Sequence, residues 1–260
     1  MLKILKYSFF DLIRSRWSYV YLLFYLLLGC VLLFLNNDLS KAVITLMNVI
    51  IILVPLIGTI FGVMYYYNSK EFTELLLAQP IKRSSIFIGQ YLGVALSLSM
   101  SLVIGLGIPF ILYGLFQSNE IWDFVLLLVT GTFLTFIFTA LAFNIALYNE
   151  NKIKGFSYSI LLWLFMAVIY DGLFLMSLIA FQSYPLDSFS IGATLFNPID
   201  LSRILILLKL DISALLGYTG AVFQKFFGTG LGLLLSMTAL SFWVVLPVLN
   251  MYRKSRKKDF

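Results

Sequence analysis

The sequence predicts an all-α polytopic membrane protein, and two observations carry that prediction. First, the 260 residues are 61% hydrophobic and only 12% charged, which is about half the charged share of a soluble domain. A soluble chain of this length cannot bury so much apolar surface, which excludes soluble enzymes, disordered chains and nucleic-acid-binding proteins. Second, six apolar stretches are long enough to cross about 30 Å of hydrocarbon as helices. They lie near residues 18–35, 42–66, 86–116, 121–147, 157–181 and 229–251.

The distribution of basic residues predicts how the spans are oriented. If the N-terminus is cytoplasmic, most of the 18 lysines and arginines fall in cytoplasmic segments, as the positive-inside rule requires. Six spans return the chain to the same side, whereas a seventh would move the basic tail at 253–258 outside. We therefore expect one domain over residues 1–260, in a bacterial inner membrane, with both termini cytoplasmic. The net charge of +6 reflects this topology and does not indicate nucleic-acid binding.

The sequence lacks the residues of several common chemistries. It contains no histidine and a single cysteine, Cys30, which excludes a Cys/His zinc site, an intrachain disulfide and a histidine-based catalytic triad. No Gly-x-x-x-x-Gly-Lys-[Ser/Thr] motif occurs, so the chain has no P-loop for ATP. We expect no catalytic residue, no metal site and no cofactor bound by this chain.

Residues 1–16 are typical of an amphipathic helix on the cytoplasmic membrane surface. Apolar residues recur at helical spacing while basic residues lie off that stripe, so the apolar side can enter the acyl boundary as the lysines meet anionic headgroups. The helix either anchors the chain or also touches a cytoplasmic partner. The apolar stripe consists of Leu2, Leu5, Phe9, Leu12 and Ile13, and the polar residues are Lys3, Lys6, Asp11 and Arg14.

The loop at 68–83 predicts a short, rigid helix between the second and third spans. Asn68 can cap its start, with Glu71 completing a capping-box-like pair, and Pro80 ends it. Phe72, Leu75 and Leu76 share one face. Such a helix either transmits force from a soluble partner or is a solvated connector. The candidate coupling residues are Glu71, Phe72, Glu74, Leu75, Leu76 and Pro80.

The long segment at 182–228 predicts two helices between the fifth and sixth spans. Asn197 is a good N-cap, Pro198 suits the first helical position and Asp200 lies near the positive end of the helix dipole. The first helix covers about 198–210 and the second about 212–227. Both lie on the outer side, either as external or as re-entrant helices, and serve as a capping hairpin, a gate or a docking surface.

Polar residues within the predicted spans are candidates for an intramembrane site. Asp171 is the one carboxylate well inside a span, so it must face protein or water, or be protonated. Arg203 and Lys209 are its nearest potential partners, and its role is either a substrate or gate residue or a structural hydrogen bond. Asn144 is a second candidate, although such groups more often join helices. The glycine pairs 58/62, 89/93 and 228/232 permit close helix packing, within the protomer or at a dimer seam.

The loop carries a resemblance to a known family. The run Glu71 to Arg83, with its leucine run, Gln79-Pro80 and basic end, resembles the coupling segment of ABC-2 permeases, and the order of segments is similar along the whole chain. The resemblance implies a six-span, type V exporter-like permease fold with an external helical hairpin between helices five and six. It also implies a homodimer driven by a cytoplasmic ABC ATPase subunit, with ATP and Mg bound on that partner.

A narrower resemblance involves the outer segment. Asn197 to Asp200, and Asp211 through Gly217 to Ala221, look like the permeases of nitrous oxide reductase maturation systems. In those systems a permease dimer works with ATPase subunits and a periplasmic accessory protein in assembly of copper sites. The chain itself supplies no copper ligand set. The resemblance implies that the outer helices dock the periplasmic partner through Asn197, Asp200, Arg203 and Tyr218.

Three other function classes compete with this one. An ion-coupled secondary transporter needs ionisable groups inside the membrane and usually repeated halves, and only Asp171 qualifies. A membrane-embedded enzyme needs converging carboxylates or a metal cluster, which the sequence does not suggest. A passive membrane scaffold for a periplasmic partner would be indifferent to ATP hydrolysis.

Overall fold

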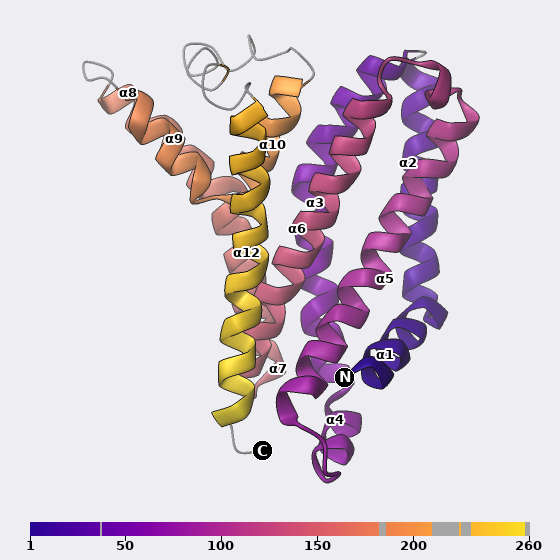
Figure 1. The fold of residues 1–260 in the computed structure, drawn as a ribbon, viewed down its shortest axis with the longest axis vertical. Coiled ribbons are helices and arrows are strands. Elements are labelled where there is room, and N and C mark those ends of the chain that lie inside the picture. The colour runs from indigo at the N-terminus through magenta and orange to yellow at the C-terminus, as the bar shows by residue number, and fades with distance from the viewer. Residues whose placement is uncertain (37, 182–185, 210–223, 225–229, 258–260) are drawn as a thin grey trace.

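The computed structural model describes residues 1–36, 38–181, 186–209, 224 and 230–257, and every regular element among them is helical (Figure 1). The helices are arranged as a bundle with short helices at one end. In chain order they are α1 (Leu2–Arg14), α2 (Arg16–Asn36), α3 (Leu39–Asn68), α4 (Lys70–Leu77), α5 (Arg83–Leu112), the 3₁₀ turn η1 (Leu115–Gln117), α6 (Ile121–Tyr148), α7 (Lys152–Leu164), the π-helix η2 (Phe165–Ile169), α8 (Tyr170–Ala180), α9 (Asp187–Leu195), α10 (Pro198–Lys209) and α12 (Gly230–Lys257).

Six helices of the described chain are long and apolar enough to cross a membrane, as predicted. They are α2, α3, α5, α6, the continuous segment α7–η2–α8, and α12. Each overlaps a span predicted from hydropathy, with ends that differ by a few residues. A seventh crossing would require α9 and α10 to form one broken span, but they meet at 116° and belong to a re-entrant turn described below.

The second, third and fourth spans form the core, and the others surround it. Half or more of the apolar windows of α3, α5 and α6 is buried, against 11% for the fifth span and 22% for α12. The predicted glycine pair on α3 explains one close contact: a methyl group at Gly62 would lie 2.9 Å from the Cβ of Ala142 on α6. The pair therefore packs within the protomer. Gly228 of the third predicted pair lies outside the described residues.

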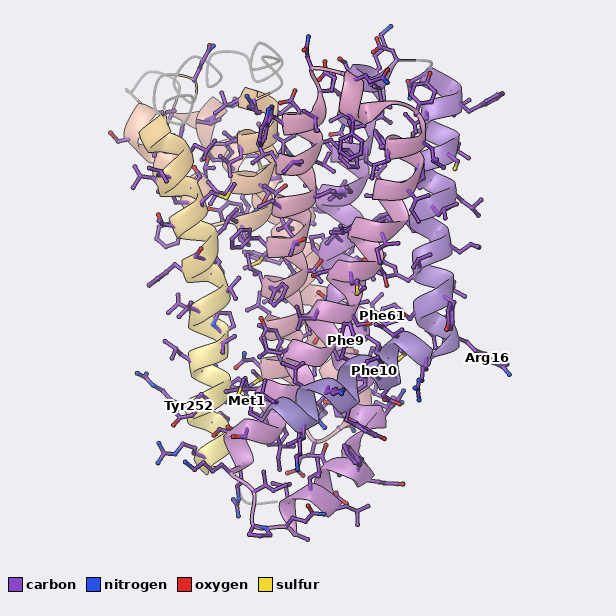
Figure 2. All side chains as sticks on the ribbon, turned by 45° about the vertical axis from the view of Figure 1, so that its right-hand side comes forward. Met1, Phe9, Phe10, Arg16, Phe61 and Tyr252 are labelled. Atoms are coloured by element: carbon purple, nitrogen blue, oxygen red, sulfur yellow. The ribbon has the colours of Figure 1, made fainter. Side chains whose placement is uncertain are left out.

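The first helix packs on the bundle through a different stripe from the predicted one. Ile4, Ser8 and Leu12 are buried against α5, whereas Leu2 is 78% exposed and the rest of the predicted stripe, except Leu12, is half-buried. Figure 2 shows α1 crossing the lower part of the bundle. The reason is the glycine pair on α5, because a Cβ at Gly93 would lie 2.6 Å from the Cβ of Ser8. A small face of α1 can therefore approach the α5 backbone closely.

The N-terminus and the last turns of α12 lie at the same end of the bundle as α4. Figure 1 shows the N-terminus and the last turns of α12 there, as six spans require. The basic residues Lys70, Lys82, Lys152 and Arg253 belong to this end. The positive-inside rule therefore favours the prediction that this end is cytoplasmic, and we call it the basic end.

Candidate functional site

The helix α4 starts one residue later than predicted. Asn68 is the last residue of α3, because the helical hydrogen bonding of α3 continues to Ser69, whose amide donates to the carbonyl of Tyr65 at 2.9 Å. Ser69 therefore stands at the N-cap of α4, and its side chain forms no capping hydrogen bond there. The predicted Asn68 cap is wrong. Asn68 instead accepts a hydrogen bond from Lys152 at 3.2 Å.

Two side chains anchor α4 to its neighbours. Phe72 stacks on Tyr7 of α1, with ring centroids 4.6 Å apart and planes at 25°. Thr73 is buried, and its hydroxyl accepts a hydrogen bond of 2.8 Å from the amide of Gln90 on α5. The sequence analysis did not predict a role for Thr73 or Gln90. The signal that could have found them is the amide side chain of Gln90 among the apolar residues of the third span. Together the two contacts join α4 to both α1 and α5.

The remaining face of α4 points away from the bundle. Glu71 and Glu74 are exposed, and Leu75 is 68% exposed. The predicted apolar face is therefore divided, since Phe72 packs on α1 while Leu75 is uncovered and Leu76 is half-buried. Pro80 is exposed and follows the last turn, which ends at Leu77, consistent with its predicted role as a helix stop.

The junction of α3 and α4 is also attached to the start of the fifth span. The hydroxyl of Tyr67 donates to the carbonyl of Asn149 at 2.6 Å, and its ring stacks on Phe156 with centroids 6.3 Å apart. Gly155 leaves room for this ring, because a Cβ there would overlap the Tyr67 side chain. The helix α4 and its junction with α3 are therefore in contact with α1, α5 and the fifth span.

A second candidate region lies between the fifth and sixth spans. There α9 and α10 form a re-entrant turn that reaches the middle of the bundle. The amide of Asn197 donates to the carbonyl of Met166 at 2.8 Å, and Met166 is the middle residue of the 29-residue fifth span. Trp243, near the middle of α12, donates from Nε1 to the carbonyl of Leu195 at 3.0 Å. The turn thus lies at mid-span depth, which resolves the alternatives of external and re-entrant helices for its described part.

The predicted start of α10 is confirmed. The side-chain oxygen of Asn197 accepts from the amide of Ile199 at 3.1 Å, with Pro198 at the first helical position. The described part of the helix runs to Lys209, and its apolar residues pack against α3, α6 and α12. The helix α9 was not predicted. The second predicted helix, at 212–227, lies outside the described residues apart from Gln224.

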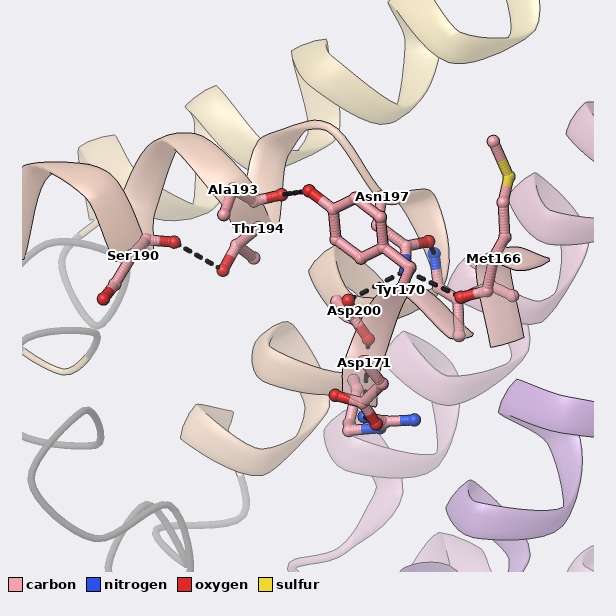
Figure 3. Close-up of polar contacts among 10 residues, drawn as sticks. Met166, Tyr170, Asp171, Ser190, Ala193, Thr194, Asn197 and Asp200 are labelled. Atoms are coloured by element: carbon pink, nitrogen blue, oxygen red, sulfur yellow. Dashed lines mark hydrogen bonds and ion pairs between the residues drawn. The ribbon is translucent and has the colours of Figure 1, made fainter. Parts of the chain in front are cut away.

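A polar cluster connects this turn to the fifth span (Figure 3). Arg203 Nη1 lies 2.7 Å from Asp171 Oδ2 and 3.3 Å from Asp200 Oδ1. Asn197 donates to Asp200 Oδ2 at 2.8 Å, and the hydroxyl of Tyr170 donates to the carbonyl of Ala193 at 2.6 Å. The ion pair of Asp171 with one of its two predicted partners is therefore confirmed. Lys209, the other predicted partner, is exposed at the end of α10.

The burial of this cluster corrects the predicted docking surface. Asn197 is fully buried and Asp200 is 6% exposed, so neither side chain is presented to an external partner. Both were predicted from the resemblance, and both instead hold the re-entrant turn in place. The side chain of Arg203 is 24% exposed. Tyr218, the fourth predicted docking residue, lies outside the described residues.

The fifth span is irregular where the cluster meets it. The residues Phe165–Ile169 form a π-helical turn directly before Tyr170 and Asp171. Such turns disturb the α-helical hydrogen-bond ladder and recur at functional sites. Here the Met166 carbonyl, which belongs to this turn, receives the amide of Asn197. The irregular turn and the re-entrant turn therefore meet at one point, with two carboxylates around one guanidinium.

The other predicted intramembrane residue, Asn144, joins two spans. Its amide donates to the carbonyls of Ala140 and Pro247, and its oxygen accepts from Asn250 at 2.9 Å. These partners place it between α6 and α12, in the role of a helix–helix contact. No group of three or more potential metal-ligating side chains occurs among the described residues.

The arrangement defines an all-α, multi-pass membrane protein, with a short helix presented at the basic end and a re-entrant turn near the middle of the spans. No family model matches the chain. It is similar to the probable ABC transporter permease protein NosY of Stutzerimonas stutzeri, with 23% identity over 254 residues, covering 92% of this chain and 85% of NosY. This similarity along nearly the full length supports the assignment of the chain to the ABC transporter permeases.

Proposed function

We propose that this permease subunit couples ATP hydrolysis on a separate cytoplasmic ATPase subunit to transport or conformational work across the membrane. The observation that carries the proposal is the geometry of α4. It is fixed to the bundle through Phe72 and Thr73, and on its exposed side it presents Leu75 beside the exposed Glu71 and Glu74. An uncovered leucine on a rigidly held helix suits a partner that grips the helix and moves it.

The coupling is mechanical, because α4 has no chemistry of its own. Closure of ATPase subunits on Mg-bound ATP would displace α4, and the Phe72 and Thr73 contacts would carry α1 and α5 with it. The Tyr67 hydrogen bond to Asn149 would carry the start of the fifth span. Packed helices change between discrete arrangements instead of deforming continuously. A displacement at the basic end would therefore repack the spans.

The narrower role we propose is assembly of the copper sites of nitrous oxide reductase. The similarity to NosY supports it, together with the resemblance of the outer segment to permeases of that system. In this role the chain works as a homodimer in a bacterial inner membrane, with its basic end cytoplasmic and a periplasmic accessory protein on the outer side. Copper would be handled by the partners, not by this chain.

Substitution on α4 tests the coupling. Leu75→Asp places a charge in the proposed interface, so we expect at least a tenfold loss of ATPase association, measured by co-purification from the native host in mild detergent. Trp122→Asp is the matched control, because Trp122 is 69% exposed at the opposite end of the bundle. Membrane insertion of both variants should equal that of the natural protein.

Three outcomes would overturn the proposal. Normal ATPase association and stimulation in Leu75→Asp would remove α4 from the coupling path. Transport by the purified chain in an ion gradient, without nucleotide, would favour a secondary transporter. Assembly of copper sites that proceeds with a hydrolysis-deficient ATPase would favour a passive scaffold.

A further inference from the structure

The helix α1 carries three different faces, and only two of them have an evident environment. Successive residues of an α-helix are about 100° apart. On that spacing Ile4, Ser8 and Leu12 form one face, which is buried against α5. The next face around the helix holds the apolar residues Leu5 and Phe9, with Leu2 and Ile13 beside them. The third face is basic and consists of Lys3, Lys6, Tyr7, Phe10 and Arg14.

The basic face is exposed and has a defined shape. Lys3, Lys6 and Arg14 are all exposed, and among the described residues none of them forms an ion pair. Arg14 lies over the ring of Phe10, with its guanidinium carbon 5.9 Å from the ring centroid. These residues line a hollow of about 690 Å³, which Asp11 borders. Three basic side chains against one acidic side chain leave the hollow positively charged.

The position of α1 places this face at the level of lipid headgroups. A single residue, Ser15, separates the helix from Arg16, where the first span begins. The helix α1 crosses α5 at Gly89 and Gly93, six and ten residues from the start of α5, which corresponds to about 9 to 15 Å along the helix. The close contacts at the two glycines oppose rotation of α1 about its own axis. Its basic face is therefore held in one orientation beside the apolar face, as in an interfacial helix.

We propose that the basic face of α1 binds the phosphate-bearing headgroup of an anionic phospholipid. The apolar face beside it accommodates the upper acyl chains, the two lysines and Arg14 contact the phosphate, and Tyr7 and Phe10 occupy the level of the ester groups. The site goes beyond the proposed coupling function and does not depend on it. It does adjoin it, because Tyr7 at the edge of the basic face stacks on Phe72 of α4.

Lipid retention measures the site directly. The full chain is placed in nanodiscs of phosphatidylcholine with phosphatidylglycerol as the anionic probe, and retained lipid is counted by native mass spectrometry. Each basic residue near a membrane contributes about 1 kcal/mol to anionic lipid binding, or about fivefold. We therefore expect Lys3→Gln/Lys6→Gln/Arg14→Gln to weaken phosphatidylglycerol retention by about 100-fold and to leave phosphatidylcholine unchanged.

A matched triple variant controls for charge alone. Lys82→Gln/Lys154→Gln/Arg253→Gln removes three exposed basic residues from the same end of the bundle without touching α1, and it should retain phosphatidylglycerol normally. Lys3→Arg/Lys6→Arg should also retain it, which separates lost binding from lost folding. Equal losses in the two triple variants would show a general charge effect and overturn the site.

The ATPase partner is the competing occupant of this face. If the α1 triple variant keeps its phosphatidylglycerol but loses ATPase association, the face belongs to that partner and the lipid site is wrong. Because lipid retention is measured without nucleotide or ATPase, a failure of the lipid site leaves the coupling proposal intact. Conversely, a Leu75→Asp variant with normal ATPase association would leave the lipid site intact.

Discussion

The two functional regions of this bundle are held in place by different kinds of contact. At the basic end, α4 and α1 are attached mainly through an aromatic stack and glycine contacts, together with one hydrogen bond. At mid-span depth, the re-entrant turn is attached to the fifth span through one ion pair and two side chain-to-carbonyl hydrogen bonds. Close packing transmits displacement because it has little free space. Polar contacts in a low-dielectric environment are strong when made and costly when broken.

The comparison assigns the two regions different mechanical properties. The basic end is suited to move as one piece with α4, since its contacts do not depend on a few atoms. The re-entrant turn is suited to two distinct positions relative to the fifth span. In one position the ion pair between Arg203 and Asp171 is formed, and in the other it is broken. Substitutions at each region should therefore fail in different ways.

The largest effect is expected at the ion pair. Arg203→Met leaves the partly buried carboxylate of Asp171 and the buried carboxylate of Asp200 without their cation, which costs about 3 kcal/mol, the lower end for a buried pair. We expect that loss of unfolding free energy in mixed micelles, with increased labelling of a cysteine placed at the buried Ile199 in a Cys30→Ser background. Lys209→Met, at the exposed end of the same helix, is the control. Equal stability of the two variants would contradict a polar attachment.

An intermediate effect is expected at the glycine contact. Gly93→Ala places a methyl group against the backbone of α1, 2.9 Å from the amide nitrogen of Phe9, and overpacking of this kind costs about 2 kcal/mol. Gly107→Ala, on the same helix, has no neighbour within 4 Å and should be neutral or slightly stabilising. Thermal unfolding of both variants tests this. If Gly107→Ala proves as harmful as Gly93→Ala, the tight junction of α1 and α5 is not the cause.

The smallest effect is expected at the aromatic stack. A double-mutant cycle of Tyr7→Ala and Phe72→Ala should give a coupling energy of about 1 kcal/mol, as found for aromatic pairs beyond their buried area. The cycle of Phe10→Ala with Phe72→Ala should be additive, because the ring contact of Phe10 is an edge-to-face contact with Phe9 of its own helix. Additivity in the first cycle would mean that the Tyr7–Phe72 stack does not help to hold α4.

Much of the candidate site could be predicted from short-range sequence patterns, and the predictions that were wrong have physical causes. The N-cap at Asn197 was predicted because capping is local, and Arg203 was one of two candidate partners for Asp171 because an intramembrane carboxylate requires a cation or a polar partner. The Asn68 cap was wrong, since α3 continues to Asn68 itself, two residues past the predicted end of the span. The docking role of Asn197 and Asp200 failed because it was inferred by resemblance, which does not report burial.

The amino-acid sequence by itself determined the six spans, the common side of the two termini and the absence of histidine chemistry, because these depend on hydropathy, charge and composition along the chain. Only the tertiary structure decided which face of α1 is buried, where the π-turn lies and how deeply the re-entrant turn enters the bundle. Each of those depends on how closely two helices approach, and that distance is set by side chains far apart in the chain, such as Ser8 against Gly93 and Asn197 against Met166.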